Sequence, residues 1–365
     1  MFIISGHVQP YAWGVPGGLN PWLENPGEGP QAELWFGAHP NGPSPLVGGA
    51  GRSLADVTDA GEVPLLAKLM AADRPLSIQL HPRAELAQQM YAGDSPLLAD
   101  ALEKQELLLA LEPFAVFAGW RDADEAAWLL RAVDPTMAGA AAAVAVGDQK
   151  TAMRALLALP PEEVERLAPA VLSAVQSLGD DEQLHSFALA ARAFPGDSGL
   201  LVLLLLFHRL LAPGAAVYMP AGGVHAYVQG FGLEVMTSSD NVLRLGLTGK
   251  QVAVAEALSA IADDGDPHFL GGEVTSEHGH AAIADYAPAG APFAVELVHR
   301  SATAGTGEYR LVLALRGAAT VRSGAEKVRL ARGQAAVVLA GEPDVEVIPD
   351  LTAVIVTTRG SAAGA

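Results

Sequence analysis

The chain has 365 residues, which is more than one hydrophobic core usually holds, so we expect two or three domains. Half of the residues are hydrophobic and 17% are charged, as in a packed globular protein. The formal net charge of -19 disfavours binding to nucleic acid or to anionic membranes, and a phosphorylated substrate would need a local basic pocket. Because the chain contains no cysteine, disulfides, thiolate metal ligands and cysteine nucleophiles are excluded. Any metal must therefore be held by His, Asp, Glu, Gln or water.

The sequence shows no signal for export or for membrane insertion. Residues 1–7 carry neither the basic region nor the long apolar stretch of a signal peptide. The longest uninterrupted apolar run, Leu200–Phe207, is far shorter than the roughly 20 residues that a membrane-spanning helix needs. We therefore predict a cytoplasmic protein.

The first two thirds of the chain change from strand-like to helical and back. Up to about residue 120, short apolar stretches broken by Gly and Pro predict strands and loops. Residues 122–211 are rich in Ala, Leu and Glu and predict four or five helices. One of these should begin at Pro160–Glu163, where proline occupies the first turn and acidic side chains lie near the positive end of the helix dipole. Strands are expected again from 212 to about 248.

The last third begins with a short helix, predicted at 253–261, and continues as a second β unit. Apolar runs beyond Pro288 are separated by turns that contain glycine, and the clearest of them cover 309–315, 335–339 and 353–357. This spacing is typical of a β-sandwich or a small barrel. No histidine occurs beyond His299, so we expect this unit to be structural. His278 and His280 lie in a polar stretch that we interpret as an exposed loop.

Several segments carry residues suited to chemistry. In 74–82, apolar residues alternate with Ser77, Gln79 and His81, so these three polar side chains share one face of a strand, where Gln79 and His81 could bind one metal ion. His225 follows a Pro-x-Gly-Gly turn of a kind common in cupin barrels. Arg244 lies on the strand face opposite three leucines and must find an anion or water. Each residue also has an ordinary structural interpretation: an exposed strand face, a core histidine and a buried ion pair, respectively.

Five segments occur in the order found in the type I mannose-6-phosphate isomerase (phosphomannose isomerase) family of the cupin superfamily, which residues 1–250 resemble. They are Tyr11–Gly14, Ala32–Pro40, Gln79–Pro82, Lys104–Glu106 and Ser239–Arg244. The resemblance implies a mainly β fold with an α-helical domain: a double-stranded β-helix (cupin, jelly-roll) bicupin with an inserted helical bundle. The implied domains are a catalytic cupin barrel formed by 1–121 and 212–262, a helical domain at 122–211, and a cupin-like β domain at 263–365.

The same resemblance implies a set of site residues. One Zn²⁺ per chain would be held by Gln79, His81, Glu106 and His225. Catalysis would involve Arg244, Lys104 and Glu234, with the acid/base role left open between Lys104 and Glu234. Substrate binding would involve Ser77, Tyr227, Trp13 and Lys250. One departure concerns Glu106, because the family usually has His-Lys-Pro-Glu where this chain has Glu103-Lys104-Gln105-Glu106.

The implied activity is the interconversion of D-mannose 6-phosphate and D-fructose 6-phosphate through a cis-enediol. The partner is then a small phosphorylated sugar, with no nucleic acid and no membrane, and the chain is expected to be a monomer or a weak homo-oligomer. Two alternatives stay open. One is another metal-dependent cupin enzyme, an oxygenase or a sugar epimerase, and the other is a non-catalytic sugar-binding cupin.

Overall fold

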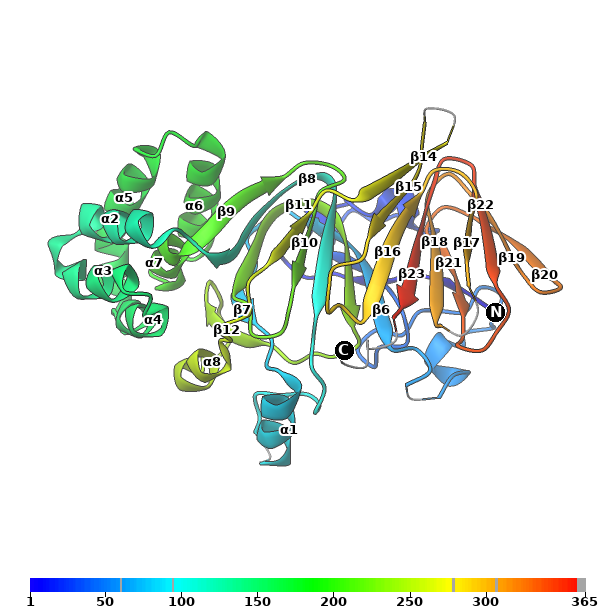
Figure 1. The fold of residues 1–365 in the computed structure, drawn as a ribbon, viewed down its shortest axis with the longest axis horizontal. Coiled ribbons are helices and arrows are strands. Elements are labelled where there is room, and N and C mark those ends of the chain that lie inside the picture. Colours follow the sequence, from blue (N-terminus) through cyan, green and yellow to red (C-terminus); the bar gives the residue numbers. More distant parts are fainter. Residues whose placement is uncertain (60, 94, 278–279, 306–307, 360–365) are drawn as a thin grey trace.

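The computed structural model describes residues 1–359, apart from 60, 94, 278–279 and 306–307. The molecule is elongated, with a group of helices at one end, the C-terminal strands at the other, and a large sheet between them (Figure 1). The expectation of a mainly β protein with a helical segment is confirmed.

The central sheet is 10-stranded and antiparallel, and its middle strands follow the order β10-β8-β11-β6-β5. Its longest members are β6 (Leu65–Ala72), β8 (Glu106–Trp120) and β11 (His225–Thr237). Both of its faces are buried, since Leu107 of β8 packs toward the C-terminal strands and Leu108 packs into a separate apolar cluster on the opposite face. The remaining strands of the sheet are β2 (His7–Gln9), β5 (Glu33–Phe36), β7 (Ile78–Leu80), β9 (Leu206–Leu211), β10 (Ala216–Met219), β12 (Leu243–Gly246) and β13 (His268–Leu270).

The helical group occupies residues 123–205 and packs on the edge of the central sheet that contains β7, β9 and β12. Helix α5 begins at Pro161 with two glutamates in its first turn, as predicted. The predicted helical segment extends too far, because Leu206–Leu211 forms β9, paired with β8. The leucine-rich run before it has no periodicity, so this change from helix to strand could not be predicted from the local pattern. The helices are α2 (Ala123–Val133), α3 (Ala138–Ala145), α4 (Gln149–Leu157), α5 (Pro161–Gln176), α6 (Asp181–Ala193) and α7 (Gly199–Val202).

Two further helices, outside the helical group, follow β7 and β12 in the chain. Helix α1 (Ala84–Ala92) follows β7, and α8 (Val254–Ala260) confirms the short helix predicted at 253–261. Within the described residues, no helix combines the length and the apolar character needed to cross a membrane.

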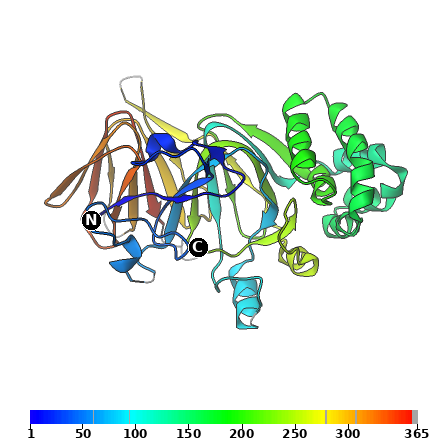
Figure 2. The ribbon, with the colours of Figure 1, turned by 180° about the vertical axis from the view of Figure 1, so that it is seen from behind.

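The C-terminal strands form a 7-stranded and a 4-stranded sheet, which share an apolar core. The strands predicted at 309–315, 335–339 and 353–357 are confirmed as β18, β21 and β23. Strand β1 (Phe2–Ser5) pairs with β21, so the start of the chain joins the C-terminal sheet (Figure 2). The other strands of the 7-stranded sheet are β14 (Glu273–Glu277), β15 (His280–Tyr286), β16 (Phe293–Val298), β18 (Arg310–Arg316), β21 (Gln334–Val338) and β23 (Thr352–Thr358). The 4-stranded sheet contains β17 (Ala302–Ala304), β19 (Ala319–Ser323), β20 (Glu326–Leu330) and β22 (Val345–Pro349).

Two sequence predictions are affected by this arrangement. The loop expected around His278 lies partly outside the described residues, and His280 opens β15 rather than lying in a loop. The proposed division into three domains stays a prediction, although β1 shows that its first segment contributes to two sheets.

Candidate active site

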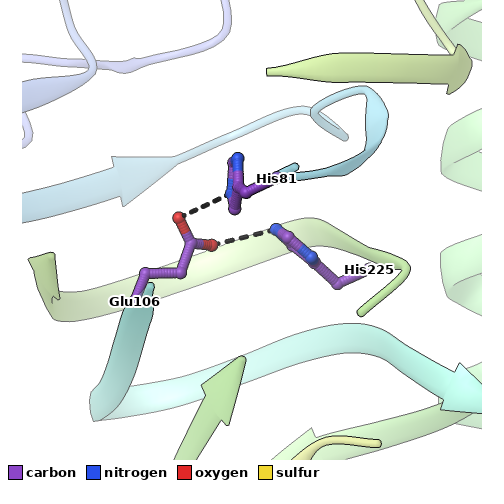
Figure 3. Close-up of side chains that lie close together, drawn as sticks. All are labelled: His81, Glu106 and His225. Atoms are coloured by element: carbon purple, nitrogen blue, oxygen red, sulfur yellow. Dashed lines mark hydrogen bonds and ion pairs between the residues drawn. The ribbon is translucent and has the colours of Figure 1, made fainter. Parts of the chain in front are cut away.

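Three buried side chains from three strand ends converge on one point (Figure 3). His81 directly follows β7, Glu106 opens β8 and His225 opens β11. His81 Nε2 lies 3.1 Å from one carboxylate oxygen of Glu106, and His225 Nε2 lies 2.9 Å from the other. All three side chains are fully buried, and their ligand atoms lie within 4.8 Å of one another. Among the described residues, this is the group of His, Asp and Glu side chains arranged to hold a metal ion.

Backbone carbonyls orient both imidazole rings. His81 Nδ1 lies 2.7 Å from the carbonyl oxygen of Asn241, and His225 Nδ1 lies 3.1 Å from that of Gly223. These contacts place the proton on Nδ1 of each ring and leave the lone pair of Nε2 directed toward Glu106. Metal-binding histidines are typically oriented in this way, by a hydrogen bond from the nitrogen that does not bind the metal.

The local sequence explains why these carbonyls are in place. The side chain of Asn241 accepts a hydrogen bond from the N–H of Ala99 and donates to the carbonyls of Asp100 and Leu102, which fixes its own backbone. The turn before His225 requires Gly222, whose φ of 87° favours glycine and whose N–H donates to the carbonyl of His81 over 2.7 Å. The Ser-Asp-Asn and Pro-x-Gly-Gly segments thus build the support of the two imidazoles.

The electrostatics of the group favour the protonation states that a cation needs. Burial, helped by nearby Lys104, lowers the pKa of His81 to about 4, so the ring is neutral at pH 7. Burial alone would raise the pKa of Glu106, but the ammonium of Lys104 at 2.8 Å holds it well below its usual value. The hydroxyl of Tyr227 donates to Glu106 over 2.8 Å.

The donor set fits zinc. Two neutral imidazoles and a carboxylate are common zinc ligands, and a site with three such ligands leaves a position open for water or substrate. The amide of Gln79 adjoins the group, with its Nε2 3.4 Å from His225 Nε2. A half-turn of that amide exchanges its nitrogen and oxygen, so Gln79 can offer an oxygen from the same position. Gln79 and His225 are also register partners on neighbouring strands.

The departure at Glu103–Glu106 leaves the carboxylate of Glu106 in position. Gln105, which replaces the usual proline, receives a hydrogen bond from the hydroxyl of Tyr218 and donates to Glu103. The Gln105 N–H also donates to Thr237 Oγ1 over 3.1 Å. These contacts hold the backbone before β8 where proline would otherwise restrict it.

A cavity of about 670 Å³ opens beside the three residues. It is lined by eight residues that the resemblance had implied, so the structure brings the predicted set together. These are Trp13, Ser77, Gln79, Lys104, Tyr227, Glu234, Arg244 and Lys250.

The cavity wall supplies the basic environment that a phosphorylated substrate requires. Arg244 is half-buried, and burial lowers the pKa of its guanidinium. Within the described part of the chain it forms no ion pair. The two carboxylates that could have paired with it have other partners. Asp240 contacts His39 and Asn41, and Glu234 contacts Lys68. Arg74 and Lys250 add positive charge at the exposed edge.

Sequence reasoning missed a cationic residue in the wall. Lys68 is the register partner of both Trp35 and Glu234, and its Nζ lies 2.6 Å from the Glu234 carboxylate and 5.3 Å from the Trp35 ring centre. The Trp35 indole N–H in turn donates to Glu33 over 2.6 Å. The available signal was a single lysine inside β6, an apolar strand whose eight residues are all buried. A lysine in such a strand needs a carboxylate partner.

A buried two-histidine, one-carboxylate group beneath a cation-lined cavity, on a scaffold of antiparallel sheets, defines a metal-dependent enzyme for a small anionic substrate. Comparison with known proteins narrows this class. The family model "Phosphomannose isomerase type I, catalytic domain" matches residues 1–123. The mannose-6-phosphate isomerase of Escherichia coli K12 is 33% identical over 378 aligned positions, which cover 93% of this chain and 95% of the relative. The human mannose-6-phosphate isomerase is 28% identical over 300 positions, covering 70% and 71%.

Solved structures agree over the full length. A crystal structure of a mutant phosphomannose isomerase from Salmonella typhimurium superposes with a TM-score of 0.81 and 28% identity, covering 99% of this chain and 100% of the other. A second, described as mannose 6-phosphate isomerase bound with zinc and yttrium, has a TM-score of 0.80 and 29% identity at the same coverage. The chain therefore belongs to the type I phosphomannose isomerase family. The predicted family and fold class are confirmed, while the bicupin description stays a prediction.

Proposed function

We propose that this chain is a zinc-dependent aldose–ketose isomerase that interconverts D-mannose 6-phosphate and D-fructose 6-phosphate. The observation that carries the proposal is the His81–Glu106–His225 group, whose contact residues Gln79, Lys104 and Tyr227 line a cavity that also carries Arg74, Arg244 and Lys250. The proposal is supported by relatives that are named mannose-6-phosphate isomerase and by a related structure described as bound with zinc. The substrate is then a small phosphorylated sugar.

His81 Nε2, His225 Nε2 and the Glu106 carboxylate would hold the zinc ion, and the amide oxygen of Gln79 would complete the protein ligands. When bound, zinc supplies a Lewis acid that polarises substrate oxygens. The hydroxyl of Tyr227 and the ammonium of Lys104 both contact Glu106, so they neutralise and orient this ligand. We therefore assign Tyr227 to the wall of the site, with its ring rather than its hydroxyl facing the substrate.

The isomerisation moves a hydrogen between C2 and C1 of the open-chain sugar, and the route we propose is a cis-enediol. A base removes the proton next to the carbonyl and returns it to the neighbouring carbon. Both candidates are ion-paired, Lys104 with Glu106 and Glu234 with Lys68. We favour Glu234, because a paired ammonium has no lone pair with which to accept a proton, whereas a paired carboxylate does. Glu234 lines the cavity, and burial raises the pKa of its carboxyl, so it is a stronger base than an exposed glutamate.

Arg244 is suited to stabilise the oxyanion that develops as the proton leaves. Its guanidinium lines the cavity and makes no ion pair with a protein carboxylate within the described residues, so its charge is available to the substrate. Strand β12, which carries it, pairs with β7 so that Arg244 lies opposite Gln79. The proposed charge stabiliser is thus fixed beside the proposed metal ligand.

The remaining predicted residues are suited to hold the rest of the sugar phosphate. Ser77, Arg74 and Lys250 line the outer part of the cavity wall and offer a hydroxyl and two cations to a phosphate group. The Trp13 ring stacks on Tyr11 at a centroid distance of 5.9 Å and gives the cavity an aromatic wall. A cytoplasmic location and a monomeric or weakly homo-oligomeric state stay predictions.

A coupled assay tests the proposal directly. Purified protein is mixed with mannose 6-phosphate, and fructose 6-phosphate is detected before and after treatment with a chelator and after zinc is added back. We expect turnover that the chelator abolishes and zinc restores, with no turnover of unphosphorylated mannose. A zinc-loaded protein that binds the sugar phosphate without producing fructose 6-phosphate would favour the sugar-binding alternative.

A further inference from the structure

The edge of the cavity includes a turn with an unusual backbone. Residues 246–250, here named the rim turn, follow β12, and four of them line the cavity. Gly246 has a φ of 132° and Leu247 a φ of 53°. A positive φ is costly for a leucine and persists only where surrounding contacts enforce it. Leu247 is also almost fully buried, so its side chain and its backbone are both fixed.

One carboxylate, at the end of the helical group, holds this turn. Asp197 Oδ1 accepts hydrogen bonds from the N–H groups of Gly199 at 2.7 Å and Leu247 at 2.9 Å. Its Oδ2 accepts from the N–H of Thr248 at 3.0 Å. Asp197 lies between α6 and α7, so these bonds connect the helical group to the rim turn. Hydrogen bonds to an ionised acceptor are among the stronger ones in proteins.

The two backbones also approach too closely for any side chain to fit between them. A Cβ on Gly199 would lie 2.6 Å from the N atom of Leu247, and a Cβ on Gly246 would lie 2.6 Å from the Cα of Gly199. The same helical segment contributes Ala193 and Phe194 to the cavity wall. Two glycines and one carboxylate therefore join the end of the helical group to the edge of the site.

We infer that Asp197 is a positioning residue, which holds the rim turn so that Lys250 faces the substrate. This inference rests on the proposed function for the identity of the substrate. Arg244, before the turn, is held by the ladder between β12 and β7 and does not depend on Asp197. Lys250, the last residue of the turn, has an N–H that donates to Thr248 Oγ1, so its placement depends on the residue that Asp197 holds. The helical group then has a role in substrate binding through this connection, in addition to the wall that Ala193 and Phe194 provide.

The inference predicts separate effects on KM and kcat. In Asp197→Ala, the rim turn loses its two hydrogen bonds to the carboxylate, from Leu247 and Thr248, while the metal ligands and the strand pairing of Arg244 are unchanged. We expect KM for mannose 6-phosphate to rise about tenfold, with kcat changed less than threefold and zinc content unchanged. Asp197→Asn keeps an oxygen acceptor but loses the second one, so its KM should lie between those of the wild type and the alanine variant.

Asp148→Ala is the matched control. Asp148 is also an aspartate in the helical group that accepts a backbone N–H, that of Thr151 at 3.0 Å, but it caps α4 away from the cavity. This variant should lose some thermal stability and keep the wild-type KM and kcat. If Asp197 only stabilised the fold, its variants would behave in the same way as Asp148→Ala.

Hydrogen–deuterium exchange provides a measurement that is independent of activity. Peptides covering 246–250 should exchange faster in Asp197→Ala and in Asp197→Asn than in the wild type, and at the wild-type rate in Asp148→Ala. If the wild type forms no fructose 6-phosphate, the proposed function fails, and exchange still reports whether Asp197 holds the turn. Unchanged exchange, or an unchanged KM in an active Asp197→Asn enzyme, overturns the inference. Because the asparagine variant keeps part of the contact, it remains informative if the alanine variant does not fold.

Discussion

The ammonium of Lys68 lies 2.6 Å from the carboxylate of Glu234, and both side chains are buried in the wall of the cavity. The two residues are register partners on β6 and β11, so the strands themselves fix their separation. Lys68 opposes the rise in the pKa of Glu234 that burial causes, and nearby Glu106 and Glu33 add to that rise. The basicity of Glu234 is therefore set by a balance of two buried cations, Lys68 and the less influential Lys104, against burial and two other carboxylates.

This balance gives a pH prediction with a defined sign. Replacing Lys68 by methionine removes the nearest cation, so the pKa of Glu234 should rise further. If Glu234 must be ionised to remove the substrate proton, activity is lost as the pH falls through this pKa. The acid limb of kcat/KM should then move to higher pH in Lys68→Met, by about one unit or more. Lys68→Arg keeps the charge and should leave the limb near its wild-type position. An acid limb that does not move in Lys68→Met would argue against Glu234 as the base.

The metal group gives a second prediction. His81→Ala and His225→Ala each remove one imidazole from a group of two imidazoles and one carboxylate, so each should lose bound zinc and nearly all activity. Elemental analysis of the purified proteins measures the zinc, and circular dichroism checks that they remain folded. His208→Gln is the control, because His208 is buried beside Ser186 rather than in this group and its loss should leave zinc content unchanged. Full zinc occupancy in both alanine variants would refute the assignment.

The sequence was most informative where a residue type and its spacing both matter. Alternation in 74–82 correctly placed Ser77 and Gln79 on the cavity side of β7, because strand geometry gives side chains two residues apart the same face. The contact of His81 with Glu106 could not be derived from spacing, since the two residues come from different strands. Lys68 was missed for the same reason, because its partner Glu234 lies 166 residues away. The resemblance to a family brought His81 and Glu106 together, whereas neither the resemblance nor local patterns pointed to Lys68.

A third prediction concerns stability rather than activity. His208 packs between β9 and α6, where its Nε2 lies 2.9 Å from Ser186 Oγ, and burial lowers its pKa to about 4. The unfolded chain, with the ordinary pKa of 6.5, binds a proton that the folded chain does not. The contribution of His208 to the free energy of unfolding is therefore fully present above pH 6.5. It is lost as the pH falls toward 4, by up to about 3 kcal/mol.

His208→Gln cannot take up this proton, so its Tm should fall less between pH 6.5 and pH 4 than that of the wild type. His81 also has a lowered pKa and contributes to the same pH range in both proteins. The difference between wild type and variant therefore isolates His208. Parallel Tm curves would show that His208 does not limit stability in acid.

The final prediction compares two arginines that the structure places in opposite situations. Arg244 lines the cavity without a carboxylate partner among the described residues. Arg310 is buried in the C-terminal unit, where its guanidinium donates to the backbone carbonyls of Gly305, Leu339, Glu342 and Pro343.

If Arg244 stabilises charge in the transition state, Arg244→Ala should lower kcat by about 10²–10³-fold with a smaller change in KM, as when one oxyanion donor is removed. Arg244→Lys keeps the charge but not the planar donor geometry, so it should recover only part of the loss. The Tm of both Arg244 variants should stay close to that of the wild type, because no protein ion pair is broken. Arg310→Ala should do the reverse and lose roughly 3 kcal/mol of stability while kcat at low temperature is kept, because it removes the hydrogen bonds that a buried guanidinium makes to four backbone carbonyls. Steady-state kinetics and thermal melts on the three variants check both halves of the comparison. An Arg244→Ala enzyme that melts many degrees lower yet turns over at the wild-type rate would assign Arg244 to the fold rather than to the reaction.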